Sequence, residues 1–180
     1  MTRSFRLFIS SSPDLAAERD ALGQAVAGLP VSIGWEIRHT PAAGEDAREA
    51  LAFIEGCDVF VLVLGMDFAA PMGLEWERAL KTARPALTYR KSVAHSPAAQ
   101  SLLRWSNVGW TEFASPPELK VRAARALAQL LLDRGEQFGL HVDDVTALWA
   151  EVHKEEQEVR PEPDQRRGAG KSGVIFGREG

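Results

Sequence analysis

The stretch DVFVLVLGMDFAAPMGLEWERAL, residues 58–80, predicts the centre of the fold. Its first part, residues 59–65, is a run of apolar or small residues with several β-branched members, which is typical of a parallel strand covered on both faces. A short loop follows, and then Met72, Trp76 and Ala79 recur at the spacing of one helix face. The segment therefore predicts a central strand followed by an amphipathic helix.

Glu75 is the unusual residue of that helix. At 3.6 residues per turn it lies about 60° from Met72 and about 40° from Ala79, so it borders the buried stripe in the expected first turn. Its carboxylate would face the carboxyl end of the strand, where open α/β sheets bind ligands. There it could stabilise positive charge on a sugar carbon as a glycosidic bond breaks, or attack that carbon. The competing interpretation is an acidic residue that favours the positive end of the helix dipole.

The rest of the sequence alternates between strand and helix patterns, which predicts βαβ units, a parallel sheet and right-handed crossovers. Ser12 before Pro13, and Ser115 with Glu118 three residues later, are expected helix starts. The further expected strands are residues 5–10, 31–37, 86–89 and 108–113, and the further helices follow Ser12, begin near Glu45 and Asp46, and follow Ser115.

Three segments are expected along the chain. Residues 3–135 form the compact α/β domain, and residues 136–159 form a helical extension whose helix runs from Val142 to about Glu158. That helix packs on the domain or serves as a connector. Residues 160–180 contain two prolines and several glycines without apolar periodicity in their first part, which is typical of a linker.

The composition indicates an ordinary globular protein: 180 residues, 45% hydrophobic, 26% charged, with a net charge of −4. That charge gives no bulk attraction to nucleic acid or to an anionic membrane, so neither is expected as a partner. Cys57 is the single cysteine, no segment has the length of a signal peptide core or membrane span, and a cytoplasmic, soluble protein is expected. The four histidines are scattered without metal-ligand spacing, so no metal site is predicted.

Two further groups of polar residues follow predicted strands. Ser10, Ser11 and Ser12 end the first strand, where hydroxyls and free N–H groups could hold a phosphate, although helix capping alone also explains them. Asp67 follows the central strand and is a candidate second carboxylate; the alternative is a loop aspartate that bonds its own backbone.

Three phrases carry a family resemblance: FISSSPDLAAERDAL at residues 8–22, CDVFVLVLG at 57–65 and LEWERAL at 74–80. Together they resemble the TIR-like domain of unknown function that precedes STAND ATPases of the NACHT and NB-ARC kind. The resemblance implies a flavodoxin-like, TIR-like three-layer α/β fold with about five parallel strands and helices on both faces. It also implies distant kinship with nucleoside deoxyribosyltransferases and NAD-hydrolysing TIR enzymes, whose catalytic glutamate matches Glu75.

The sequence differs from that family pattern at two places, and a third place supports the resemblance. Such relatives often carry Tyr-Gly after the strand and Ser-x-Thr before the glutamate, whereas this chain has DFA at 67–69 and PMG at 71–73. The final phrase, VIFGREG at 174–180, resembles the beginning of such ATPase modules. This resemblance predicts that the 180 residues are the N-terminal piece of a longer protein.

The sequence thus predicts an N-terminal signalling or effector domain of a STAND-type, NLR-like protein, with a role in anti-phage defence as one setting. As a candidate NAD or nucleotide N-glycosidase activated by oligomerisation, it would place Glu75 at the scissile ribose, with Asp67 assisting and residues 10–12 near the phosphates. No cofactor is expected beyond that substrate, and the expected partners are further copies and the C-terminal ATPase. The alternative is a non-catalytic interaction module, and a weaker one is a stand-alone deoxyribosyltransferase-like enzyme.

Overall fold

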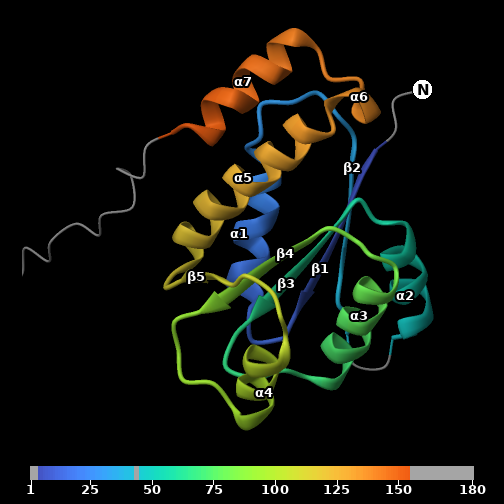
Figure 1. The fold of residues 1–180 in the computed structure, drawn as a ribbon, viewed down its shortest axis with the longest axis vertical. Coiled ribbons are helices and arrows are strands. Elements are labelled where there is room, and N and C mark those ends of the chain that lie inside the picture. The colour runs from blue at the N-terminus through green and yellow to red at the C-terminus, as the bar shows by residue number, and fades with distance from the viewer. Residues whose placement is uncertain (1–3, 43–44, 155–180) are drawn as a thin grey trace, which may run out of the picture.

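The structure is a computed structural model that describes residues 4–42 and 45–154. Its five strands pair in parallel in one sheet with the order β2-β1-β3-β4-β5 (Figure 1). This order defines a flavodoxin-like α/β sheet, and it confirms the predicted fold class. The strands are β1 (Phe5–Ser11), β2 (Trp35–His39), β3 (Val59–Leu64), β4 (Ala86–Lys91) and β5 (Thr111–Phe113).

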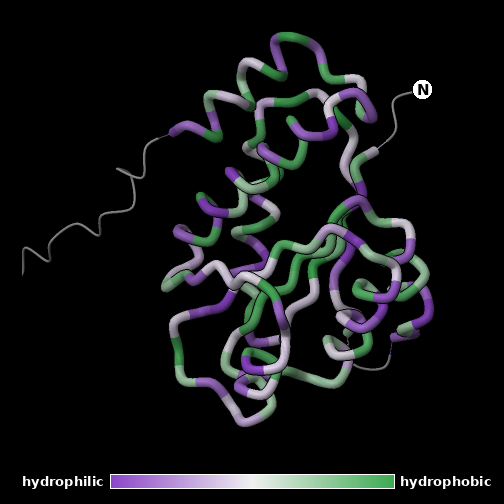
Figure 2. Tube along the Cα trace, in the orientation of Figure 1, coloured by the Kyte–Doolittle hydropathy of each residue, from purple (hydrophilic) through white to green (hydrophobic). Residues whose placement is uncertain are grey.

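Helices cover both faces of the sheet. On one face α1 (Ala16–Ala27) packs beside α5 (Pro116–Asp133), and on the other α2 (Ala47–Gly56) packs beside α3 (Ala70–Lys81) (Figure 1). Each face has its own apolar core, and Figure 2 shows the hydrophobic strands running between the two helical layers. The remaining helices are α4 (Pro97–Trp105), α6 (Gly135–Phe138) and α7 (Val142–Val152).

Strand β3 is the centre of the sheet, as its sequence predicts. It pairs with β1 on one side and β4 on the other, and all six of its side chains are buried. Val61 faces the core beneath α1 and α5, whereas Phe60 and Leu62 face the core beneath α2 and α3. Alternate residues of a strand point to opposite faces, and burying each large apolar side chain contributes about 1.5–3 kcal/mol.

The start of α1 differs from the prediction. The helix begins at Ala16, and the residue before it, Leu15, makes no side-chain capping bond, so Ser12 is not its cap. Instead the Leu15 N–H donates to the Ser12 carbonyl at 3.1 Å, which closes a turn through Pro13. Leu15 is buried against Gly65, where an added Cβ would come within 3.0 Å of the leucine side chain. This packing fixes the turn and delays the helix by three residues.

The position of Glu75 in α3 also differs from the prediction. Because α3 begins at Ala70 with Pro71 in its first turn, Glu75 lies in the second turn, and no acidic residue occupies the first. Glu75 belongs to the buried face itself, together with Met72, Trp76 and Ala79. The helix-dipole explanation for this glutamate is therefore wrong, since the dipole acts mainly within the first turn.

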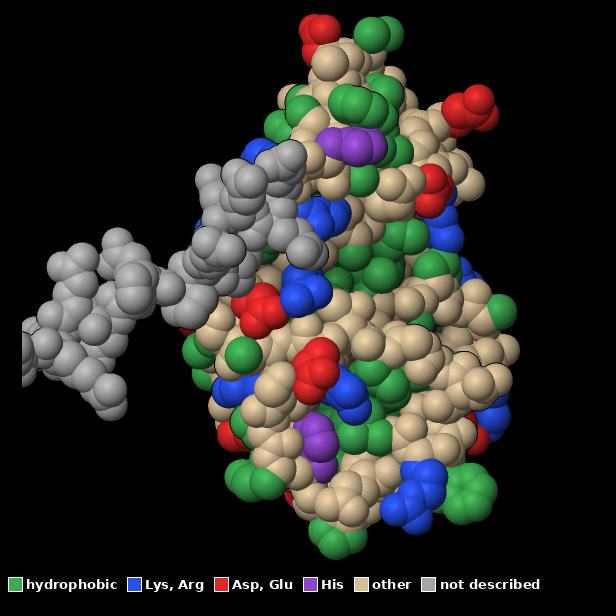
Figure 3. All heavy atoms as spheres, turned by 60° about the vertical axis from the view of Figure 1, so that its left-hand side comes forward, with side chains coloured by type: hydrophobic (Ala, Val, Ile, Leu, Met, Phe, Trp, Pro, Cys, Tyr) green, Lys and Arg blue, Asp and Glu red, His purple; other side chains and the backbone are tan. Residues whose placement is uncertain are grey.

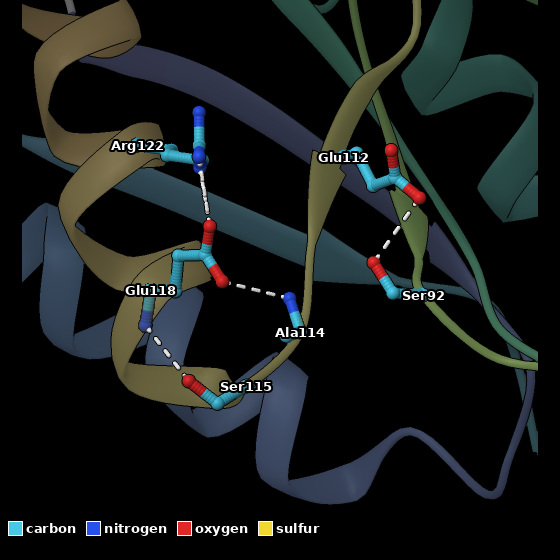
Figure 4. A network of polar contacts seen from close by, with 6 residues as sticks. All are labelled: Ser92, Glu112, Ala114, Ser115, Glu118 and Arg122. Carbon is cyan, nitrogen blue, oxygen red and sulfur yellow. Dashed lines mark hydrogen bonds and ion pairs between the residues drawn. The ribbon is translucent and has the colours of Figure 1, made fainter. Parts of the chain in front are cut away.

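Helix α5 begins as predicted at Ser115, with one change in its cap. The Ser115 Oγ accepts a hydrogen bond from the Glu118 N–H at 3.4 Å, but the Glu118 carboxylate accepts from the Ala114 N–H instead of that of Ser115 (Figure 4). Arg122, one turn later, holds the other carboxylate oxygen at 2.8 Å. This network ties the end of β5 to the start of α5.

Several other boundaries differ from the sequence-based ones. Strand β2 starts at Trp35, four residues late, because its pairing with β1 begins opposite Phe5. Strand β5 starts at Thr111, not Val108. Helix α4 was not predicted, although Ser96 caps it by accepting from the Ala99 N–H and Pro97 occupies its first position.

The helical extension packs on the domain. Helix α7 lies along α5 and buries Leu148, and Phe138 of α6 contacts Phe5 with ring centroids 5.0 Å apart. The end of α7 at Val152 falls short of the expected Glu158, and residues 155–180, including the predicted linker, lie outside the described residues. No helix in the described ranges has the length and apolar character needed to cross a membrane.

Candidate functional site

Glu75 lies in a polar cluster buried beneath the carboxyl edge of the sheet. Its Oε2 accepts a hydrogen bond from the Ser10 hydroxyl at 2.6 Å and another from the Thr40 hydroxyl at 2.9 Å. Only 3% of Glu75 is exposed, and its Oε1 has no hydrogen-bond partner among the described residues. The cluster thus holds a carboxyl group with two hydroxyl groups, and no ion pair joins Glu75 to a cation within residues 4–42 and 45–154.

The fold explains why these three residues meet. Ile9 of β1 faces the α1 and α5 core, so Ser10 points to the opposite face, where α3 presents Glu75. Thr40 directly follows β2, whose register places His39 opposite Ile9. Because parallel strands end at the same edge, Ser10 near the end of β1 and Thr40 just after β2 converge on the second turn of α3.

Burial controls the protonation of Glu75. Removal from water raises its pKa to about 7, while the hydrogen bonds from Ser10 and Thr40 oppose that rise. Both the protonated and the charged form of Glu75 are therefore accessible near neutral pH. A carboxyl group with such a pKa can serve as a base, an acid or a nucleophile under physiological conditions.

The three serines predicted as a phosphate site have separate surroundings. Ser10 joins Glu75, as described above, and the Ser11 N–H donates to the Thr40 hydroxyl at 3.1 Å. Arg19 donates to the Ser11 hydroxyl at 3.3 Å and to the Ser12 carbonyl at 2.8 Å. The Ser12 hydroxyl is buried without a hydrogen-bond partner among the described residues. The structure thus brings Ser10 to Glu75 and fixes the rest of the run through Arg19.

Asp67, the predicted second carboxylate, lies in the exposed loop between β3 and α3. Its Oδ1 accepts from the Phe68 N–H at 2.8 Å and from the Ser96 hydroxyl. The hydrogen bond from Ser96 lowers the Asp67 pKa, and the one from Phe68 adds to that effect. No hydrogen bond within the described ranges joins Asp67 to the Glu75 cluster, so its assisting role stays a prediction.

Thr40 is the member of the cluster that the sequence did not indicate. A lone threonine in a predicted loop has no distinguishing motif, and its proximity to Glu75 follows from strand register. Thr40 also lines a surface hollow of about 600 Å³ between the end of β2 and α2. The other lining residues are Ile37, Arg38, His39, Pro41, Glu45, Asp46, Glu49 and Ala50.

A second buried glutamate lies on the opposite face. Glu18, in the first turn of α1, is 2% exposed, and its Oε1 is 2.7 Å from the ammonium nitrogen of Lys91 at the end of β4. Lys91 is thus a cationic partner for the buried Glu18 carboxyl group. Glu18 lies in residues 8–22, one of the segments that carry the family resemblance. Its ion pair with Lys91 gives it a structural role, because it joins α1 to the end of β4.

These features define a flavodoxin-like α/β domain with a buried carboxyl group at the carboxyl edge of its sheet. That group accepts hydrogen bonds from two hydroxyl groups, and no ion pair to it occurs in the described part of the chain. The chain belongs to the DUF4062 family, a domain of unknown function, whose family model matches residues 6–128. No curated protein matches the chain.

Three solved structures have a similar path of the chain. One is the CMP N-glycosidase BcmB of Clostridium botulinum, at 16% identity over 65% of this chain and 96% of that one, with a TM-score of 0.46. Another is general stress protein 14 of Treponema denticola in complex with FMN, at 16% identity, 70% and 97% coverage, and a TM-score of 0.41. A third is the apo NADH:FMN oxidoreductase EMOB, at 13% identity, 83% and 87% coverage, and a TM-score of 0.39. Similarity at this level concerns the fold, and the ligands of those proteins assign nothing to the residues around Glu75.

Proposed function

We propose that this domain is an N-glycosidase that cleaves the bond between ribose and base in NAD⁺ or a related nucleotide. The observation that carries the proposal is Glu75, a buried carboxyl group held by Ser10 and Thr40, with a pKa of about 7. Functional carboxyl groups are often kept unpaired and desolvated in this way, whereas structural ones are usually matched with a cation.

The chemistry needs one carboxylate at the ribose. The Glu75 carboxylate forms a bond to C1′, or stabilises the positive charge that develops there, as the C1′–N bond breaks. The electron pair of that bond moves onto the departing base. Water then adds to C1′ and releases one of its protons to the solvent, while the ester bond to Glu75 breaks if it has formed and its electron pair returns to the carboxylate.

NAD⁺ suits this arrangement because its nicotinamide nitrogen is positively charged before the bond breaks. The departing electron pair neutralises that charge, so the leaving group needs no proton. A neutral nucleoside differs, since its base leaves readily only when an acid protonates it. The charged form of Glu75 therefore suffices for NAD⁺, and this step needs no acid at the leaving group.

Activation by association between copies belongs to the same proposal. Ser10, Ser11, Ser12 and Glu75 are each at most 3% exposed, so substrate entry requires the loops above them to move. Contacts between copies would supply the free energy for such a movement. An N-terminal position before a STAND-type ATPase, and a setting in defence against phage, rest on the sequence resemblance.

The test is nicotinamide release by protein that is fused to an oligomerising scaffold. We expect the clustered wild-type domain to cleave NAD⁺ and the Glu75→Gln variant to lose that activity. Glu77→Gln is the matched control, because Glu77 lies on the same helix but is exposed and paired with Lys81. Absence of nicotinamide release by the clustered wild type would overturn the proposal.

A second candidate function is a non-catalytic interaction module. Apolar side chains reach the surface at both ends of the long axis (Figure 3), and Trp105 at the end of α4 is 81% exposed. On α7, Val142, Val145 and Trp149 are exposed along one side of the helix. Such exposed apolar residues are typical of surfaces that contact other proteins. This function is favoured if association persists in Glu75→Gln while no substrate is cleaved by the wild type.

A further inference from the structure

The two oxygens of the Glu75 carboxyl group have different surroundings. Oε2 accepts from two hydroxyl groups, those of Ser10 and Thr40, whereas Oε1 has no hydrogen-bond partner in the described part of the chain. A half-turn of the carboxyl group would exchange two chemically equivalent oxygens, and the same two hydrogen bonds would form again. The hydrogen bonds therefore define two positions, one in which an oxygen is held (Oε2) and one without a hydrogen-bond partner among the described residues (Oε1).

The direction of the Thr40 hydroxyl is itself fixed. Its oxygen accepts the Ser11 N–H at 3.1 Å, and its one proton is donated to Glu75 at 2.9 Å. The Thr40 N–H in turn donates to the Ile9 carbonyl at 3.1 Å. Backbone and side chain of Thr40 are thus both tied to β1, which leaves the hydroxyl little freedom to point elsewhere.

Thr40 also reaches an open space at the surface. It lines the hollow of about 600 Å³ beside α2, while Glu75 itself is almost fully buried. A substitution of Thr40 would change the hydrogen bonding of the Glu75 carboxyl group and leave that group itself in the protein.

We propose that Thr40 is a positioning residue, which holds Oε2 of Glu75 so that Oε1 is the oxygen that meets the sugar carbon. The assignment of Oε1 rests on the proposed function. The positioning by Thr40 is a property of the folded domain and can be measured without substrate.

The hydrogen bond from Thr40 favours the charged form of Glu75 and so opposes the effect of burial. Thr40→Val keeps the shape of the side chain but removes the hydroxyl, and we expect it to raise the Glu75 pKa by roughly one pH unit. Thr40→Ser keeps a hydroxyl and should restore the wild-type value. Thr82→Val is the matched control, since Thr82 closes the same helix through a bond to the Arg78 carbonyl.

The experiment is a pH titration of the Glu75 carboxyl carbon by ¹³C NMR in all four proteins, followed by the pH profile of NAD⁺ cleavage in their clustered forms. In Thr40→Val the acidic limb of the profile should move to higher pH together with the titration, and kcat should fall about tenfold with little change in KM. Thr40→Ser and Thr82→Val should resemble the wild type in both measurements.

The two parts of the proposal fail in different ways. An unchanged Glu75 titration in folded Thr40→Val would overturn the positioning role of Thr40, whatever the activity. A shifted titration without any cleavage by the wild type would leave the positioning in place and overturn the proposed function together with the assignment of Oε1.

Discussion

Two glutamates are withdrawn from water on opposite faces of the same sheet, and their partners differ in kind. Glu18 on α1 faces the Lys91 ammonium at 2.7 Å. Glu75 on α3 faces two hydroxyl groups, and one of its oxygens has no hydrogen-bond partner among the described residues. Both are about equally buried, so the contrast lies in the partners alone.

The contrast separates a carboxylate used for packing from one suited to chemistry. The Lys91 cation offsets part of the cost of burying Glu18 and joins α1 to the end of β4. Hydroxyl groups offset that cost only in part, and the pKa of Glu75 therefore rises to about 7. The glutamate that faces hydroxyl groups in place of a cation is the one that can exchange a proton or attack a carbon at neutral pH.

The largest expected effect is on activity. Glu75→Gln should reduce NAD⁺ cleavage by the clustered domain by about 10²–10⁴-fold, the range for loss of one catalytic acid or base. Glu18→Gln should keep the activity of its folded fraction, because Glu18 lies on the other face. Nicotinamide release, normalised to the folded fraction from circular dichroism, checks both. Equal losses in the two variants would remove the distinction between the two glutamates.

The next effect is on the pH dependence of stability. Because Glu75 has a raised pKa, the folded state binds more protons than the unfolded state, and stability falls as the pH rises. The contribution is fully present below about pH 4.5 and is lost as the pH rises through about 7, a total of about 3 kcal/mol. Urea unfolding of the wild type and Glu75→Gln from pH 5 to 9 measures it.

The difference between these two proteins isolates Glu75 from the other titrating groups. Relative to the wild type, Glu75→Gln should gain stability above pH 7 and gain little below pH 5. Parallel curves at all pH values would show that burial does not shift this group.

Disruption of the Glu18–Lys91 pair should have a smaller effect on stability. Glu18→Gln leaves Lys91 without its partner, but Lys91 is partly exposed and can reach water, so we expect a cost of about 1–3 kcal/mol. A double-mutant cycle with Lys91→Met measures the coupling by urea unfolding at pH 7. A coupling near zero would mean that the pair does not secure α1.

The sequence predicts the fold better than the site because the two depend on different information. The apolar run of β3 and the alternation of strands and helices establish the parallel sheet and its centre. Element ends depend on tertiary contacts, and Leu15 packing on Gly65 moved the start of α1 past the Ser12–Pro13 signal. Helix α4 lacked a long apolar period and was missed despite its Ser96 cap.

Only part of the site could be predicted, because some of its residues are brought together by tertiary contacts alone. Glu75 could be identified because a charged residue on an apolar helix face is visible in the sequence, and Ser10 because it ends a buried strand. Thr40 could not, since its meeting with Glu75 depends on the register of β2 against β1. The sequence also does not reveal the role of Glu18. Its partner, Lys91, lies 73 positions later in the chain, and only the structure shows that the two are in contact.

The smallest expected effect on stability and activity is that of replacing Asp67, a third carboxylate to compare with Glu18 and Glu75. It is exposed, and it holds Ser96 at the start of α4 and the Phe68 N–H beside it. Asp67→Ala should therefore lower the Tm by about 1–2 °C and change NAD⁺ cleavage less than about threefold. Ser96→Ala removes the same hydrogen bond and also the cap of α4, so it should lower the Tm further than Asp67→Ala does. A loss of about 100-fold in Asp67→Ala alone would instead assign Asp67 the assisting role that its place after β3 predicts, because a catalytic group contributes at least that much.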